Sequence, residues 1–147
     1  MRMRGDDFLQ IAQQLLKAPS EAAYRTATNR AYYAVFHRCV AFLSGLGFEA
    51  SIGPQAHGQL QGRINNSGVI EGQQLYRILH RLYDRRRVAD YDLHSQEFHS
   101  QATAALLVAS AGQAITMIAD CEKSQDLCRR IREGIHTYEN KLKTPKR

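Results

Sequence analysis

Two arginine–histidine pairs share one spacing in this chain. Six residues separate Arg30 from His37, and six also separate Arg87 from His94. An imidazole transfers protons near neutral pH, and a guanidinium offers forked donors to a phosphate whose charge grows in the transition state. Each pair is therefore a minimal set for phosphodiester cleavage, although a chain with 20 Lys+Arg and six histidines also produces such spacings by chance.

The first pair lies in a run free of glycine and proline, residues 20–44, which predicts a helix with Ser20 as its N-cap. At 100° per residue the apolar side chains collect on one arc, whereas Arg30, Tyr33 and His37 follow i, i+3, i+7 spacing on the opposite side. The pattern predicts one core face and one face that carries a cation, a phenol and an imidazole.

A purely structural role for that polar face is the alternative. Its side chains would then pair with an acid on a neighbouring helix, for which Asp90 is the obvious candidate. Arg25 falls on the apolar arc of the same helix and also needs a polar partner if it is buried.

The second pair spans the end of another helical pattern, predicted over about 69–88. Residues 90–93 are expected to break the chain between helices, and Ser95 is expected to cap a helix over 95–123. His94 would then lie just before a helix N-terminus, where backbone amides favour an anion.

The chain as a whole predicts an all-α fold, because no segment alternates with period 2 and no repeat of 20–50 residues occurs. We expect a single bundle of about five helices over 1–124. An additional C-terminal helix and a basic tail over 125–147 would belong to the same domain. The remaining predicted helices cover about 6–17, a short segment within 54–68, and 125–141.

The amino-acid composition and net charge limit the classes of protein to which this chain can belong. Hydrophobic residues make up 44% and charged residues 23%, which is ordinary for a soluble globular protein. No apolar run approaches the ~20 residues of a membrane span, and no signal peptide follows Met1, so we expect a cytoplasmic protein without a membrane partner. The net charge of +6, with three consecutive arginines at 85–87, suits an anionic partner.

Motifs for metal or cofactor binding do not occur in the sequence. There is no GxGxxG, Walker loop, HExxH or zinc-spaced Cys/His set, and Cys39, Cys121 and Cys128 show no CxxC spacing. His94 and His99 are five residues apart, with no carboxylate at a ligand spacing. We therefore expect reduced thiols, no metal and no cofactor.

Two segments carry a family resemblance. Residues 23–37, AYRTATNRAYYAVFH, resemble the second helix of the HEPN superfamily, and residues 82–92, LYDRRRVADYD, resemble its later R…ADYD element. With the alanine-rich helix that follows, the resemblance covers roughly 6–122. It implies a compact helical bundle that forms a homodimer.

The resemblance also implies an activity. Many HEPN proteins are metal-independent endoribonucleases, often toxins or antiviral effectors. Their Arg-x(4–6)-His motif forms a composite site across the dimer, where the RNA 2′-hydroxyl attacks the adjacent phosphate. A toxin of this kind implies an antitoxin, for instance a small nucleotidyltransferase, identifiable from the neighbouring gene.

Carried onto this chain, the motif makes Arg87 and His94 the first catalytic candidates and Arg30 and His37 the second. Tyr33 and Asp90 are candidates for a supporting role in the site. Arg85 and Arg86 are expected to bind the RNA backbone. The chain departs from many active members, because Ala31 and Val88 follow the two arginines and no tyrosine lies shortly after His94. A catalytically silent HEPN module that binds a nucleotide, RNA or a nucleotidyltransferase partner therefore stays open.

Overall fold

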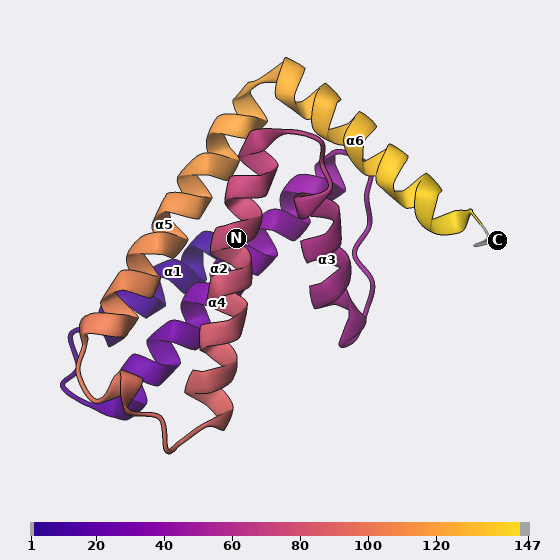
Figure 1. The fold of residues 1–147 in the computed structure, drawn as a ribbon. Coiled ribbons are helices and arrows are strands. Elements are labelled where there is room, and N and C mark those ends of the chain that lie inside the picture. Colours follow the sequence, from indigo (N-terminus) through magenta and orange to yellow (C-terminus); the bar gives the residue numbers. More distant parts are fainter. Residues whose placement is uncertain (1, 145–147) are drawn as a thin grey trace. The chain divides into compact units, whose positions relative to one another are not determined.

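The computed structural model describes residues 2–144 of the chain. Helix accounts for 79% of the protein and the described part has no strand, which confirms the predicted all-α class with an extra C-terminal helix. The elements in chain order are α1 (Gly5–Leu15), α2 (Glu21–Gly45), α3 (Gln55–Asn65), α4 (Ile70–Tyr91), the short 3₁₀ helix η1 (Gln96–Phe98), α5 (Ala102–Lys123) and α6 (Gln125–Lys143) (Figure 1).

Local capping explains where several helices begin. The Ser20 hydroxyl accepts a hydrogen bond from the Ala23 amide at 3.1 Å, which confirms the predicted N-cap of α2. Ser124 caps α6 in the same way, through the Leu127 amide at 3.1 Å. At α1 the Asp7 carboxylate accepts from the Arg4 amide at 2.8 Å, so the acidic first turn also fixes the start of this helix.

Two predicted boundaries were wrong. Helix α4 continues through Asp90 and Tyr91, where the sequence predicted a break, and the Asp92 amide still donates to the Val88 carbonyl at 3.0 Å. The helix predicted over 95–123 is also interrupted. Ser95 caps only η1, and α5 begins at Ala102. Full burial of Phe98 holds this segment as a separate 3₁₀ turn, a tertiary effect that local pattern does not encode.

The chain forms two compact units, and helices α2, α4 and α5 each contribute a part to both. Unit 1 comprises the chain through Arg38 with Ile78–Thr116, and unit 2 comprises Cys39–Arg77 with the chain from Met117 onward. The predicted boundary at residue 124 falls inside unit 2, where α6 packs against α3.

Unit 1 packs α1 closely on α2. A Cβ on Gly5 would lie 2.5 Å from the Ala34 carbonyl oxygen, so only glycine permits this approach. Small residues on α2 and α5 surround a few large buried side chains. The large, fully buried apolar side chains of unit 1 are Tyr32, Val35, Leu79, Leu82, Phe98 and Leu107.

Unit 2 packs α6 on α3 and on the turn before α4. A Cβ on Gly134 would clash with the Ser67 carbonyl oxygen, so α6 meets this turn backbone to backbone. Ile131 and Ile135 of α6 are buried beside Phe42 and Leu43 at a small apolar cavity. The C-terminal helix is therefore part of the core of unit 2. The end of the predicted basic tail, 145–147, lies outside the described residues.

The three cysteines are free, with Cys39 and Cys121 buried and Cys128 partly buried. Burial is the first cause that raises the pKa of the Cys121 thiol, followed by the negative charge of Glu71.

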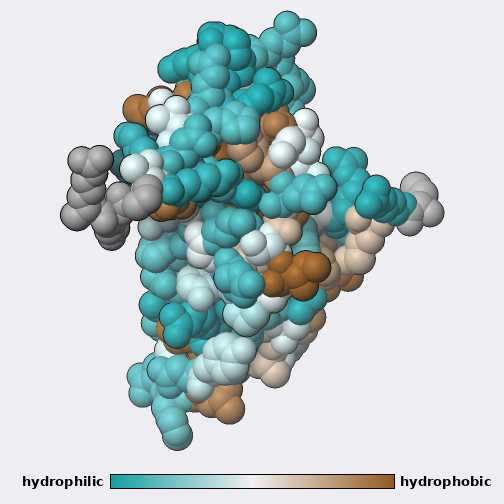
Figure 2. Space-filling view, turned by 90° about the vertical axis from the view of Figure 1, so that its right-hand side faces the viewer, coloured by the Kyte–Doolittle hydropathy of each residue, from teal (hydrophilic) through white to brown (hydrophobic). Residues whose placement is uncertain are grey.

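Helix α5 is long and apolar enough to cross a bilayer by length and composition alone. This is weak evidence for a membrane segment, since core helices have the same composition, and Leu107, Ala111 and Ile118 of α5 are buried in the protein. The face drawn in Figure 2 is mainly hydrophilic, with small apolar areas between the polar side chains.

Candidate active site

One candidate site is an aromatic cluster of α1 and α2 in unit 1, formed by Phe8, Arg30, Tyr33 and His37. The guanidinium carbon of Arg30 lies 5.0 Å from the centroid of the Phe8 ring. The His37 ring stacks on the same ring, with centroids 5.6 Å apart and planes inclined by 26°. Tyr33 completes the cluster, 5.9 Å from the Arg30 guanidinium carbon and 6.0 Å from the His37 ring. The fold therefore brings Arg30 and His37 to one aromatic ring.

The electrostatics of this cluster favour a neutral imidazole. Partial burial of the ring is the first cause that lowers the pKa of His37 below 6.5, and the positive charge of Arg30 lowers it further. At neutral pH His37 is then mostly unprotonated and can accept a proton. Among residues 2–144, no carboxylate pairs with Arg30, whose contacts are with ring faces, so its N–H donors stay available to an anion.

Asp90 pairs with neither Arg30 nor His37, so it is not the predicted counter-ion of these two groups. Its Oδ2 accepts from the Asn29 side-chain amide at 2.8 Å and lies 3.4 Å from Nη1 of Arg86. Asn29 and Asp90 thus join α2 to α4 within unit 1. Asn29 comes one residue before Arg30 in sequence but points to a different side of the helix, which separates this carboxylate from the arginine.

Arg86 is largely buried in unit 1, which makes it a weak candidate for the predicted contact with an RNA backbone. The residue is 8% exposed, and its guanidinium carbon lies 5.4, 5.6 and 5.5 Å from the rings of Tyr32, Tyr33 and Tyr83. Consecutive helical residues diverge by 100°, so three arginines in a row cannot share one face. Little of this guanidinium is therefore exposed to a phosphate outside the protein.

Arg85 is partly exposed but already engaged. Its Nη1 forms an ion pair with the carboxylate of Glu97 in η1. An RNA phosphate would have to compete with this carboxylate, so Arg85 is a weaker candidate for backbone binding than the sequence indicated.

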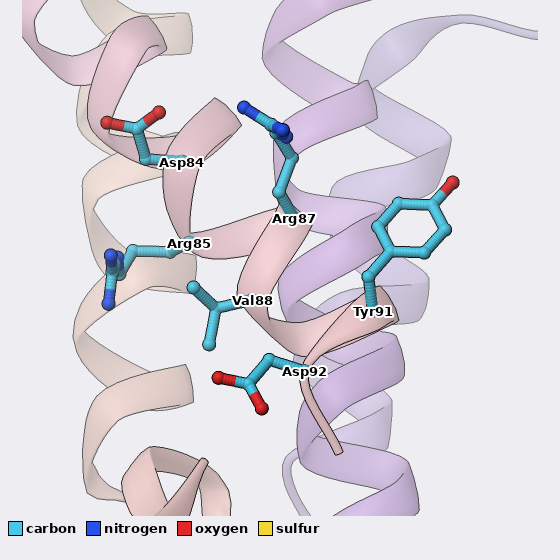
Figure 3. A pocket seen from close by; sticks show the side chains of 6 residues that line it. All are labelled: Asp84, Arg85, Arg87, Val88, Tyr91 and Asp92. Atoms are coloured by element: carbon cyan, nitrogen blue, oxygen red, sulfur yellow. The ribbon is translucent and has the colours of Figure 1, made fainter. Parts of the chain in front are cut away.

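Arg87 and His94 are not joined in the described chain. Arg87 is exposed, with its guanidinium carbon 5.7 Å from the ring of Tyr83. It lines an open hollow of about 480 Å³ on α4, together with Asp84, Arg85, Val88, Tyr91 and Asp92 (Figure 3). His94 does not line this hollow. It is exposed in the turn after α4, where its amide donates to Oδ1 of Asp92 at 3.2 Å.

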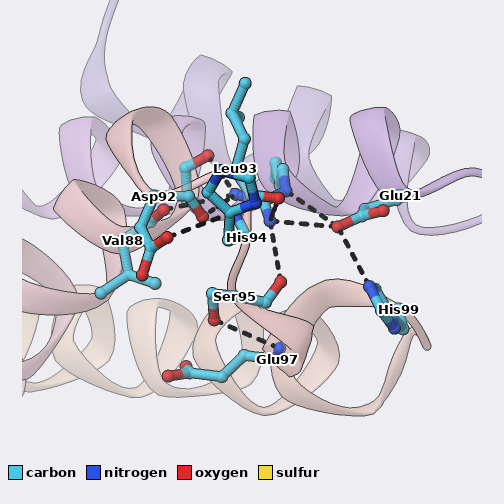
Figure 4. Close-up of polar contacts among 10 residues, drawn as sticks. Glu21, Val88, Asp92, Leu93, His94, Ser95, Glu97 and His99 are labelled. Atoms are coloured by element: carbon cyan, nitrogen blue, oxygen red, sulfur yellow. Dashed lines mark hydrogen bonds and ion pairs between the residues drawn. The ribbon is translucent and has the colours of Figure 1, made fainter.

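Arg25 holds that turn in place and is the residue whose importance the sequence only hinted at. Its guanidinium donates to the carbonyl oxygens of Ala89 at 2.9 Å, Asp92 at 3.0 Å and Ser95 at 3.0 Å. Longer bonds reach Val88 and Leu93, and Oε1 of Glu21 accepts from the same group at 3.0 Å (Figure 4). The need of a polar partner was predictable from its place on the apolar arc. Apart from Glu21, four residues earlier, its partners were not predictable, because they are backbone carbonyls more than 60 residues away.

Binding of a metal ion requires several ligand side chains close together. Within residues 2–144, no group of three or more His, Cys, Asp or Glu side chains is placed to hold a metal ion. The chemistry available in the aromatic cluster is that of arginine, histidine and tyrosine side chains.

Comparison of the chain with protein-family models, with curated proteins and with solved structures gives no match. The resemblance of the α2 and α4 segments to HEPN proteins thus rests on their residues alone.

Proposed function

We propose that the chain is a metal-independent HEPN-type endoribonuclease that acts as a homodimer. The observation that carries this proposal is the joining of Arg30 and His37 at the Phe8 ring, with a depressed His37 pKa and an arginine that no carboxylate of residues 2–144 neutralises. The two segments that resemble HEPN motifs and the helical fold add support. Arg30 and His37 now rank above Arg87 and His94, because only the first pair shares a contact.

The chemistry proposed for this pair follows from its protonation. Neutral His37 takes the proton of an RNA 2′-hydroxyl, and the resulting oxygen attacks the adjacent phosphorus. The P–O5′ bond breaks, which leaves a 2′,3′-cyclic phosphate and a 5′-oxygen that must gain a proton. Arg30 stabilises the added negative charge on the phosphate oxygens. The leaving 5′-oxygen takes a proton from water, and the proton held by His37 returns to the solvent, which restores the neutral imidazole.

A silent HEPN module that binds nucleotide, RNA or a nucleotidyltransferase partner is the second candidate. The separation of Arg87 and His94 favours it, because the pair nearest the family position has no shared contact. A role in toxicity or antiviral defence, an antitoxin and a cytoplasmic location belong to the same proposal and depend on the same test.

Cleavage of total RNA in EDTA tests the proposal. We expect Arg30→Ala and His37→Ala to lose activity, the histidine variant by roughly 100- to 10,000-fold, and Arg87→Ala and His94→Ala to lose less. The matched control is His136→Ala in unit 2, an imidazole that also packs on a phenylalanine, 4.8 Å from Phe48. Its activity should equal that of the parent protein.

Two outcomes would overturn the assignment. Equal residual cleavage in His37→Ala and His136→Ala would identify a contaminating nuclease. Activity that EDTA abolishes and Mg²⁺ restores would exclude the metal-independent mechanism. Light scattering coupled to gel filtration checks the homodimer, and a monomer at assay concentration would remove the composite site.

A further inference from the structure

We propose that the hollow on α4 binds one ribonucleotide unit, either a free ribonucleoside phosphate or an unpaired nucleotide of an RNA. This surface is distinct from the aromatic cluster that contains Arg30 and His37, and ligand binding there does not require cleavage. The inference assigns a binding role to Tyr91 and Asp92, two residues of the ADYD segment that the proposed reaction does not use. It also assigns Arg87 a role in binding in place of catalysis.

Tyr91 supplies a platform for a base. It is 76% exposed at the end of α4 and lines the hollow together with Val88, three residues earlier. Figure 3 shows its ring standing clear of the helix, beside Arg87. The face of a tyrosine ring is a stacking surface for any base, and a base stacked on Tyr91 would cover apolar area that is now exposed to water.

Arg87 supplies the cation for the phosphate. Its guanidinium carbon lies 5.7 Å from the centroid of the Tyr83 ring, and the residue is exposed. No carboxylate of residues 2–144 pairs with Arg87, so its planar fork of N–H donors is available to two phosphate oxygens. Arg85 on the opposite side of the hollow is tied to Glu97, so Arg87 is the better placed of the two.

The hollow also contains two carboxylates, Asp84 and Asp92, which a surface that binds polyanions by positive charge alone would not need. Asp84 lies 3.3 Å from Nε2 of His80, whereas Asp92 uses Oδ1 to accept from the His94 amide and keeps Oδ2 for a ligand. A carboxylate oxygen accepts from hydroxyl or amino groups, and the ribose 2′-hydroxyl is the donor that separates RNA from DNA. Aromatic ring, guanidinium and carboxylate together match base, phosphate and sugar.

The size and rigidity of the hollow also suit one nucleotide. Its volume of about 480 Å³ falls within the ~300–1,000 Å³ typical of small-ligand sites. Arg25 fixes the backbone of the turn that carries Asp92 through hydrogen bonds to the Ala89 and Asp92 carbonyls. A preorganised turn lowers the entropy lost on binding.

Fluorescence anisotropy with the full chain tests the inference. The probes are a labelled single-stranded RNA octamer and the DNA octamer of the same sequence, with unlabelled AMP and UMP as competitors. We expect Tyr91→Ala to weaken RNA binding roughly 5- to 100-fold, as for loss of one stacked base, and Tyr91→Phe to bind like the parent protein. Asp92→Asn, which keeps an acceptor for the His94 amide, should reduce the preference for RNA over DNA.

Matched controls come from exposed side chains outside the hollow. Arg81→Gln removes the same charge from α4 as Arg87→Gln, and Leu93→Ala removes a side chain that is 72% exposed. Circular dichroism confirms that each variant is folded. Competition by AMP or UMP identifies a free nucleotide as the ligand, and RNA binding without such competition identifies an RNA segment.

Equal RNA affinity in Tyr91→Ala, Arg87→Gln and Arg81→Gln would overturn the inference, as would a parent protein that binds none of the probes. The outcome is separable from that of the cleavage assay. RNA binding without cleavage would support the nucleotide site on α4 and overturn the proposed ribonuclease activity. Cleavage, together with unchanged RNA binding in Tyr91→Ala, would support the ribonuclease activity and overturn the nucleotide site.

Discussion

The two units of this protein each contain a phenylalanine ring contacted by an arginine and a histidine. In unit 1 the ring is Phe8, with Arg30 at 5.0 Å and His37 at 5.6 Å. In unit 2 it is Phe48, with Arg63 at 5.6 Å and His136 at 4.8 Å. Three residue types recur at similar distances in both places.

Their surroundings differ. Arg63 is 8% exposed, and its Nε donates to Oε2 of Glu139 at 2.9 Å while Nη1 donates to the Glu49 carbonyl at 2.9 Å. Arg30 has no carboxylate partner among residues 2–144. The contrast teaches that residue types around a ring do not identify a site. A neutralised, buried arginine stabilises the fold, and one without a counter-ion can serve an anionic ligand.

Replacement of each arginine by glutamine should give the largest difference in stability between the two units. Arg63→Gln leaves Glu139 without its cation, and we expect the free energy of unfolding to fall by about 2–3 kcal/mol, below the ~3–5 kcal/mol of a fully buried pair, because Glu139 keeps 27% exposure. Arg30→Gln should change it by no more than about 0.5 kcal/mol. Urea denaturation measures both. Similar losses in the two variants would show that Arg30 is also structural.

Replacement of the two phenylalanines by leucine should give a smaller difference in the free energy of unfolding, again with the larger loss in unit 2. Phe48 is 4% exposed and Phe8 is half-buried, so Phe48→Leu should destabilise the protein by about 1–1.5 kcal/mol and Phe8→Leu by clearly less. Thermal unfolding followed by circular dichroism compares them. A larger loss in Phe8→Leu would mean that the unit 1 ring is primarily a core residue.

The smallest effect is a change in the pKa of His37. Arg30→Gln removes a charge that disfavours the imidazolium, so the pKa should rise, but it should stay below 6.5 because burial is the larger cause. NMR titration of the His37 ring protons measures it, with Arg81→Gln as the control. An unchanged pKa in Arg30→Gln would remove the electrostatic link between the pair.

The same shift determines the sign of one pH dependence. His37 binds a proton more weakly in the folded chain than in the unfolded chain, whose ordinary value is 6.5. Between the two pKa values the unfolded state holds more protons, so this group makes the free energy of unfolding increase as the pH rises through that window. His37→Gln should lose this part of the slope in urea denaturation at several pH values.

Much of the fold was predictable from local patterns. The uninterrupted 20–44 run predicted α2, and Ser20 predicted its N-cap. The position of Arg25 on an apolar arc correctly indicated a buried cation in need of partners. These features depend on residues a few positions apart, where helical geometry fixes which side chains share a face.

The candidate sites were less predictable, because the sequence alone could not say what lies opposite each face. Identical spacing made the two arginine–histidine pairs equivalent, and three consecutive arginines looked equally available. Packing of α1 placed Phe8 beside Arg30 and His37, while the tyrosine rings of α2 and α4 enclosed Arg86.

The sequence by itself therefore determined the all-α class, the extent of α2 with its N-cap, and the division of α2 into an apolar and a polar face. Tertiary structure decided which charges are neutralised, which are buried and which remain available to a ligand. The physical reason is the distance along the chain over which each interaction acts. Helical periodicity acts over one or two turns, whereas the burial and charge that set the pKa of His37 or the partners of Arg63 come from elements distant in the chain.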